Sequence, residues 1–161
     1  ALKTRFAPIP LRSVIEQVRQ IYQPLAEARG VELAVAAGSA EGRVDGIEEL
    51  LVELLGNLVD NALRHTPKGG AVRIEVVADA GSGVRLAVTD SGPGIPEEFA
   101  QKIFDRFAQV PGGEIGTAGL GLSLAAQIAA VHGGELRLAN PGKPGARFEC
   151  RLPAHGNTLL G

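Results

Sequence analysis

The chain has 161 residues, of which 45% are hydrophobic and 21% are charged, and its net charge is -2. A chain of this length and composition can bury a hydrophobic core, and we expect it to form a single domain. The slight negative charge provides no basic surface for nucleic acid, and one Tyr with no Trp leaves little for base stacking. No apolar run approaches the ~20 residues of a membrane span. We therefore expect a cytoplasmic protein that contacts neither nucleic acid nor membrane, and its single cysteine, Cys150, fits a reducing compartment.

The first half of the chain predicts a short extended segment, a helix, a strand and a second helix. Apolar residues recur at helical spacing over residues 11–25, and Gly30 ends this first helix. Residues 31–36 alternate as a strand. Asp45 is a candidate N-cap for the second helix, which extends to about His65.

The second half predicts two hairpins, separated by a turn-rich stretch and a third helix. The expected elements are strands at 71–78 and 84–89, a short helix at 96–107, a helix at 119–131, and strands at 135–139 and 146–152. Helices and antiparallel hairpins in this order predict an α+β fold, a two-layer sandwich of one mixed, mostly antiparallel sheet with three main helices on one face. We expect one domain over residues 1–153 and a disordered tail over 154–161.

Two asparagines four residues apart, Asn57 and Asn61, interrupt the apolar pattern of the second helix. At about 100° per residue they share one arc with Glu53 and Arg64, whereas leucines fill the opposite arc. Asn is a poor helix former because its amide competes for backbone hydrogen bonds. Two of them in mid-helix therefore indicate a functional face.

Two glycine-rich stretches occur where backbone can meet a ligand. Asp90-Ser91-Gly92-Pro93-Gly94-Ile95 follows a strand, so that the Asp90 carboxylate can accept a hydrogen bond from an amino group on a flat ring. The stretch at 116–122 opens into a helix, where N–H groups can hold an anion. Either stretch alone is more often a plain surface loop, and neither is a P-loop or a dinucleotide fingerprint.

Together with the helix amides, this order of features resembles the catalytic ATP-binding domain of sensor histidine kinases, within the GHKL superfamily that includes gyrase-type ATPases. Residues 57–65 resemble the N box of that family, 90–95 the G1 box, 103–107 the F box and 119–122 the G2 box. The resemblance covers nearly the whole chain and implies the Bergerat fold. One departure is Thr117, which stands where the G2 box usually begins with Gly.

The resemblance implies ATP and Mg²⁺ as cofactors. It makes Asn61 the metal ligand and Asp90 the partner of the adenine amino group, and it places Asn57 and Arg64 in the catalytic machinery near the phosphates. The other nucleotide-binding residues that it implies are His65, Gly92, Gly94, Ile95, Thr117, Gly119, Leu120, Gly121 and Leu122. The segment 108–118 then corresponds to the ATP lid.

The residue at position 57 separates kinase from ATPase chemistry. Gyrase-type relatives carry there the Glu that activates water, and the amide of Asn57 cannot act as a general base. Mg²⁺ keeps several waters, so one amide oxygen and phosphate oxygens are sufficient ligands. We therefore expect transfer of the γ-phosphoryl group to a histidine on a helical-hairpin phosphoacceptor domain of the parent kinase, with a response regulator downstream.

Two other functions stay open from the residues. A serine kinase of the anti-sigma-factor type shares the nucleotide site, although its relatives usually carry Glu at position 57. A nucleotide-binding regulatory module would bind ATP and a partner without phosphotransfer. As a fragment the chain is expected to be a monomer, and its parent a homodimer that is either soluble or membrane-anchored.

Several residues near these motifs have structural interpretations. Phe104 and Phe107 are expected to be buried anchors rather than a latch for a partner helix. His132, which precedes Gly-Gly, is expected to be a partner of the helix C-terminal dipole. Cys150 is expected to be a buried, inert thiol. His65 is either a helix-terminal cation or a nucleotide contact.

Overall fold

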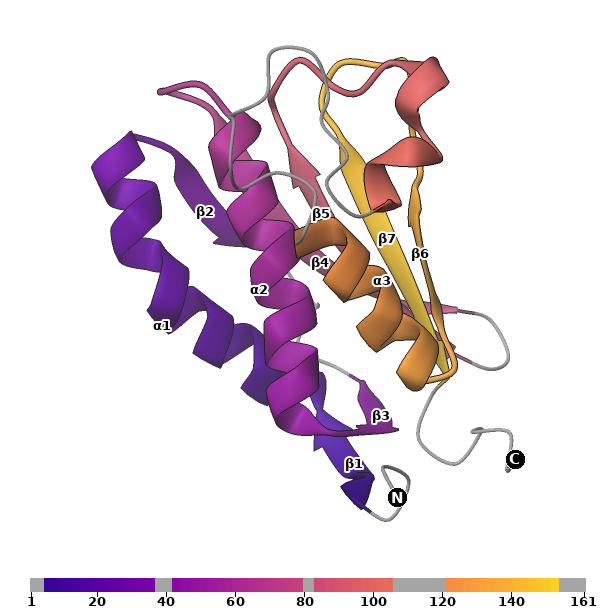
Figure 1. Ribbon diagram of the computed structural model, residues 1–161. Helices are drawn as coiled ribbons and strands as arrows, with labels where there is room; N and C mark the ends of the chain where they lie inside the picture. The colour runs from indigo at the N-terminus through magenta and orange to yellow at the C-terminus, as the bar shows by residue number, and fades with distance from the viewer. Residues whose placement is uncertain (1–4, 37–41, 80–82, 106–120, 154–161) are drawn as a thin grey trace.

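The structure is a computed structural model, and it describes residues 5–36, 42–79, 83–105 and 121–153. Its elements follow in chain order (Figure 1): β1 (Ala7–Pro10), α1 (Leu11–Arg29), β2 (Glu32–Val35), β3 (Arg43–Gly46), α2 (Glu48–His65), β4 (Ala71–Asp79), β5 (Gly83–Asp90), η2 (Glu97–Phe99), η3 (Lys102–Phe104), α3 (Gly121–Val131), β6 (Glu135–Leu138) and β7 (Arg147–Pro153). Within these ranges, none of the helices has the length and hydropathy of a membrane-spanning segment. The expected tail at 154–161 lies outside the described residues.

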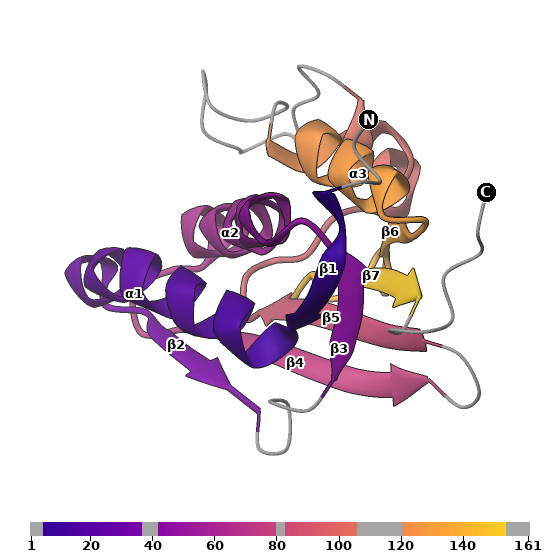
Figure 2. The same cartoon turned by 90° about the horizontal axis from the view of Figure 1, so that it is seen from below.

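A five-stranded sheet forms one layer, and α1, α2 and α3 cover one of its faces (Figure 2). The strand order is β2-β4-β5-β7-β6; β2 and β4 are parallel, and the other neighbours are antiparallel. The predicted two-layer α+β sandwich is therefore confirmed.

The helical periodicity of α2 explains how the sheet and the helices share one core. Its leucine arc is completely buried, with no exposed surface on Leu51, Leu54, Leu55 and Leu58. Asn57, Asn61 and Arg64 on the opposite arc are half-buried, and Glu53 is exposed. The arc that carries the two amides therefore faces away from the core, as the sequence predicts.

The start of α2 differs from the prediction, because Asp45 is not its N-cap. Asp45 belongs to β3, which pairs with β1 in a small antiparallel sheet where Pro8 is its register partner. Ile47 occupies the N-cap position and makes no side-chain cap bond. The pairing with β1 places Val44 in the core, and this burial overrides the local capping preference of Asp45.

The predicted helix at 96–107 is also different. Its described part forms two separate 3₁₀ turns, η2 and η3. Phe104 at the end of η3 packs against the core and meets the ring of Phe148 edge-on, with the ring centroids 6.0 Å apart. The anchor role is thus confirmed for Phe104, whereas Phe107 lies outside the described residues.

His132 makes the predicted contact at the C-terminal end of α3 and a second contact that the sequence did not predict. It is 2% exposed, its Nε2 accepts the backbone N–H of Ile47 at 3.2 Å, and its Nδ1 lies 2.8 Å from the carbonyl oxygen of Ile128. The ring of Phe6 stacks on it, with centroids 5.2 Å apart. Burial lowers the pKa of His132. A neutral imidazole therefore ties the end of α3 to the start of α2; its contact with the Ile128 carbonyl oxygen confirms a partner at the C-terminal end of α3, whereas the contact with Ile47 was not predicted.

Cys150 lies in β7 on the core side of the sheet and is completely buried. Burial raises the pKa of its thiol to about 12. The thiolate is the reactive form of cysteine, so the expected inert thiol is confirmed.

Candidate functional site

The N-terminal end of α3 lies beside the middle of α2 (Figure 1). A Cβ atom on Gly121, at the start of α3, would lie 3.9 Å from the side chain of Asn57. The Nδ2 group of Asn57 is buried and has no hydrogen-bond partner among the described residues. A buried donor without an acceptor is destabilising. Together with the first N–H groups of α3, the Asn57 amide therefore forms a set of donors suited to an anion.

Arg64 lies on the same arc as Asn57, and its position is fixed by Asp60 one turn earlier. Its Nε donates to Asp60 Oδ2 at 2.8 Å, and about a quarter of each side chain is exposed. Tyr22 of α1 packs against Gly56 of α2, where a Cβ would lie 3.2 Å from the ring. Burial and the nearby Asp60 carboxylate raise the pKa of Tyr22. The sequence patterns did not identify Tyr22, because its approach to α2 is a tertiary contact.

Asp90 lies at the end of β5 and is 5% exposed. Its Oδ1 accepts two backbone N–H groups, from Gly92 at 2.9 Å and from Ala146 at 3.2 Å. Its Oδ2 makes no hydrogen bond to the described residues. Burial raises the pKa of Asp90, whereas the two backbone hydrogen bonds and nearby His65 lower it. One oxygen is thus held by the backbone, and the other is left as an acceptor.

The glycines after Asp90 are required by close backbone contacts. A Cβ on Gly92 would clash with the carbonyl oxygen of His65 at the end of α2. Gly94 has a φ of 84°, and a Cβ there would clash with the carbonyl oxygen of Lys143. The first contact joins the Asp90 segment to α2, and the second joins it to the turn before β7.

The structure therefore places the predicted residues in two connected groups. One group, which we call the base end after the role that the resemblance implies, contains Asp90, Gly92 and Gly94 beside His65. The other, which we call the phosphate end for the same reason, contains Asn57 and Asn61 with Arg64 and Gly121. Leu122 is buried in the core, whereas Ile95 packs against the core and keeps part of its side chain exposed. The remaining predicted positions, Thr117, Gly119, Leu120 and the segment 108–118, lie outside the described residues.

A feature that the sequence patterns missed is the turn between β6 and β7, which supplies Ala146 to Asp90. Its sequence, Asn140-Pro141-Gly142-Lys143-Pro144-Gly145, indicates a turn but not what the turn contacts. The contact joins residues 56 positions apart.

Comparison with known proteins identifies the family. Residues 46–156 match the family model of the histidine kinase-, DNA gyrase B- and HSP90-like ATPases. The chain belongs to this ATPase family. The matched residues include α2, the Asp90 segment, α3 and the last hairpin, so both ends of the candidate site lie inside the matched range.

Relatives and solved structures place the chain among the histidine kinases of this ATPase family. The alginate biosynthesis sensor protein KinB of Pseudomonas aeruginosa is 37% identical over 152 residues, which are 94% of this chain and 25% of KinB. The chain thus spans a quarter of the length of that relative. The mycobacterial sensor histidine kinase MprB superposes with a TM-score of 0.80 at 28% identity, covering 92% of this chain and 98% of that one.

The catalytic domain of histidine kinase ThkA gives a TM-score of 0.79 at 30% identity, covering 92% of this chain and 97% of that domain. ThkA has also been solved in complex with the response regulator protein TrrA, a structure of which this chain covers 42% at a TM-score of 0.78. These matches confirm a histidine-kinase-type ATP-binding domain and do not favour the serine kinase or the regulatory module.

Proposed function

We propose that this chain binds ATP with Mg²⁺ and transfers the γ-phosphoryl group to a histidine on a separate phosphoacceptor domain of a sensor kinase. The observation that carries the proposal is the buried Nδ2 of Asn57, which lacks an acceptor beside the N-terminal end of α3. A phosphate oxygen in this place would satisfy the amide and the first N–H groups of the helix together.

The phosphate end also fits a magnesium ion. Asn61 lies one helical turn after Asn57 on the same half-buried arc, and its amide oxygen is the hard, neutral ligand that Mg²⁺ accepts. When bound, the ion would neutralise charge on the phosphate oxygens. Arg64, held through Nε by Asp60, would add positive charge on the same side of the triphosphate.

The base end fits adenine. Because Oδ1 of Asp90 is occupied by two backbone donors, Oδ2 is available to accept the 6-amino group. Gly92 and Gly94 let the chain pass close to α2 and to the β6–β7 turn, and a flat ring needs such a side-chain-free approach.

The chain's own residues favour transfer over hydrolysis. Asn57 cannot take a proton from water, and its role is to donate a hydrogen bond and orient the phosphates. Efficient transfer would therefore depend on an acceptor histidine supplied by another domain. The match to a quarter of KinB supports a longer parent protein, and the ThkA–TrrA complex supports a response regulator as the later partner. The proposal also includes a monomeric isolated domain, a homodimeric parent that is either soluble or membrane-anchored, and a cytoplasmic location for this domain.

Mixing this chain with a separately made phosphoacceptor hairpin of the parent kinase and γ-labelled ATP tests the proposal. The expected product is an acid-labile, base-stable phosphoryl group on the hairpin, formed only when Mg²⁺ is present. Asn61→Ala serves as the matched negative control. Label on serine, or ATP hydrolysis by the isolated chain at about one turnover per second, which is within the range of a working enzyme, would contradict it.

A further inference from the structure

The turn between β6 and β7 forms the back of the base end. The backbone N–H of Asp90 donates to the carbonyl oxygen of Ala146 at 2.9 Å, and the N–H of Ala146 donates to Asp90 Oδ1 at 3.2 Å. The N–H of Gly145 donates to the carbonyl oxygen of Gly92 at 2.8 Å. The turn is therefore bonded both to the carboxylate of Asp90 and to the backbone around it.

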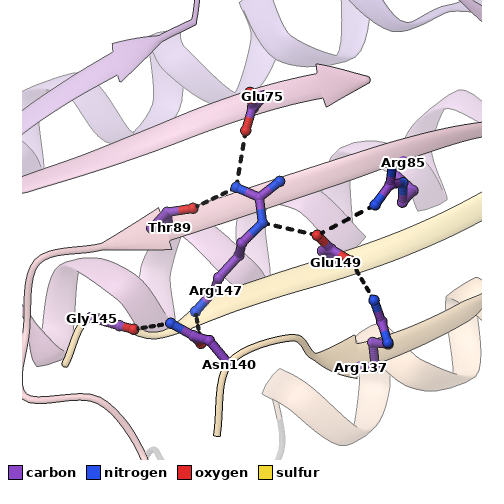
Figure 3. Close-up of polar contacts among 8 residues, drawn as sticks. All are labelled: Glu75, Arg85, Thr89, Arg137, Asn140, Gly145, Arg147 and Glu149. Carbon is purple, nitrogen blue, oxygen red and sulfur yellow. Dashed lines mark hydrogen bonds and ion pairs between the residues drawn. The ribbon is translucent and has the colours of Figure 1, made fainter. Parts of the chain in front are cut away.

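The side chain of Asn140 closes this turn on itself (Figure 3). Its Nδ2 donates to the carbonyl oxygen of Gly145, and its Oδ1 accepts the backbone N–H of Arg147 at 2.8 Å. The carbonyl of Gly145 and the N–H of Ala146 belong to one peptide group. Asn140 therefore binds one edge of the peptide whose other edge holds Asp90, and hydrogen bonds in such a chain strengthen one another.

Gly145 cannot set the orientation of that peptide by itself. It has a φ of 72°, and a Cβ there would lie 2.6 Å from the carbonyl oxygen of Asp90, so only glycine fits. Glycine also has the widest choice of backbone conformations. Backbone bonds to Gly92 and Asp90 hold the residues on either side of this peptide, and the side chain of Asn140 is the group that bonds its carbonyl oxygen directly.

The far side of the turn is anchored without Asn140. The guanidinium of Arg147, the first residue of β7, bonds Glu75 at 2.9 Å, Thr89 at 3.1 Å and Glu149 at 2.9 Å on the face of the sheet that the helices leave uncovered (Figures 2 and 3). Glu149 also accepts a hydrogen bond from Arg137 at 3.0 Å. Loss of the Asn140 side chain should therefore loosen the peptide at Ala146 and leave β7 in its place.

We infer that Asn140 is a positioning residue for recognition of the purine 6-amino group, acting through the Gly145–Ala146 peptide on Asp90. The inference rests on the proposed function, in which Asp90 reads adenine. With the peptide fixed, Oδ1 is engaged by backbone donors and Oδ2 is aimed at the base. With the peptide free, the carboxylate loses one of its two donors and can turn away from the base.

Equilibrium titrations with ATP and with purine riboside triphosphate, which lacks the 6-amino group, test the inference. Unaltered protein should prefer ATP by about tenfold or more, the size of a hydrogen bond to a charged group. Asn140→Ala should reduce this preference to about threefold and leave the affinity for purine riboside triphosphate unchanged. Lys143→Ala, an exposed position in the same turn, is the matched control and should keep the full preference.

Two further variants separate the possible failures. Asn140→Asp keeps the size of the side chain and the acceptor for Arg147 but removes the donor to Gly145, so it should lose the preference even if Asn140→Ala does not fold. Equal loss of affinity for both nucleotides in these variants would mean a general structural role and would overturn the inference.

Asp90→Asn should abolish the preference for ATP over purine riboside triphosphate. If it does while the Asn140 variants keep the preference, the inference alone fails; if Asp90→Asn keeps it, the assignment of Asp90 in the proposed function fails too.

Discussion

The base end and the phosphate end of the candidate site differ in how fully their polar groups are bonded within the protein. At the base end, Asp90 Oδ1 already has two backbone donors, and the β6–β7 turn supports it from behind. At the phosphate end, the buried Nδ2 of Asn57 has no acceptor among the described residues. A preorganised end can select the base, whereas an end with unused donors gains most when phosphate arrives.

The largest effect should come from removing Asn61, the proposed metal ligand at the phosphate end. Asn61→Ala is expected to lower phosphotransfer about a hundredfold, because Mg²⁺ contributes several kcal/mol to stabilising phosphoryl charge. Binding of adenosine, which uses only the base end, should not change. Both quantities can be measured, by labelled transfer to the acceptor hairpin and by titration with adenosine. A parallel loss of adenosine binding would show that the two ends are not separate.

The next prediction concerns Asp90 at the base end. Its replacement by Asn should weaken ATP binding but raise the melting temperature of the protein without nucleotide. Asp90→Asn should weaken ATP binding about tenfold, since an amide is a poorer acceptor than a carboxylate. Burial raises the pKa of Asp90, so its contribution to stability is present at low pH and is lost as pH rises through that pKa. Without added nucleotide at neutral pH, the variant should therefore melt at a slightly higher temperature than the unaltered protein.

The higher melting temperature of Asp90→Asn should depend on pH. Thermal melts of both proteins at neutral pH and near pH 4 should show the advantage of Asp90→Asn shrinking at the lower pH, because the raised pKa makes Asp90 take up a proton more readily as the pH falls. A variant that melts lower at neutral pH would show that the charge of Asp90 is stabilising, contrary to the expected sign.

At the phosphate end, the unpartnered amide of Asn57 should cost stability. Asn57→Leu replaces a buried donor without an acceptor by an apolar group of similar size, and the free energy of unfolding should rise by about 1 kcal/mol. Phosphotransfer should fall in the same variant. Urea denaturation without nucleotide measures the first change, and Val52→Leu, a half-buried apolar position of the same helix, is a control for added helix propensity.

Local periodicity was sufficient to predict the half-buried arc of α2 that carries the two amides and insufficient to predict how Asp90 is supported. The arc of Asn57 and Asn61 follows from helical spacing within one element, and Asp90 was recognisable at the end of a β-rich run. The role of Asn140 depends on a turn that meets residues about 50 positions earlier, and no local pattern encodes such a contact. Asp45 was misassigned for the same reason, because its pairing with β1 is not visible in the sequence around it.

The smallest effect tests whether the candidate site is independent of the far ends of α2 and α3, which His132 joins. Burial lowers the pKa of His132, so its contribution is present above the ordinary histidine pKa of about 6.5 and is lost as pH falls through the lowered value. His132→Gln should be less stable at pH 7.5, and the difference should shrink by at most about 1.4 kcal/mol per pH unit below 6.5. Because Asp90 titrates in both proteins with the opposite sign, comparing their melts cancels its contribution. ATP affinity at pH 7.5 should be the same in both. A lower affinity in the variant would mean that the far junction of the helices also sets the geometry of the phosphate end.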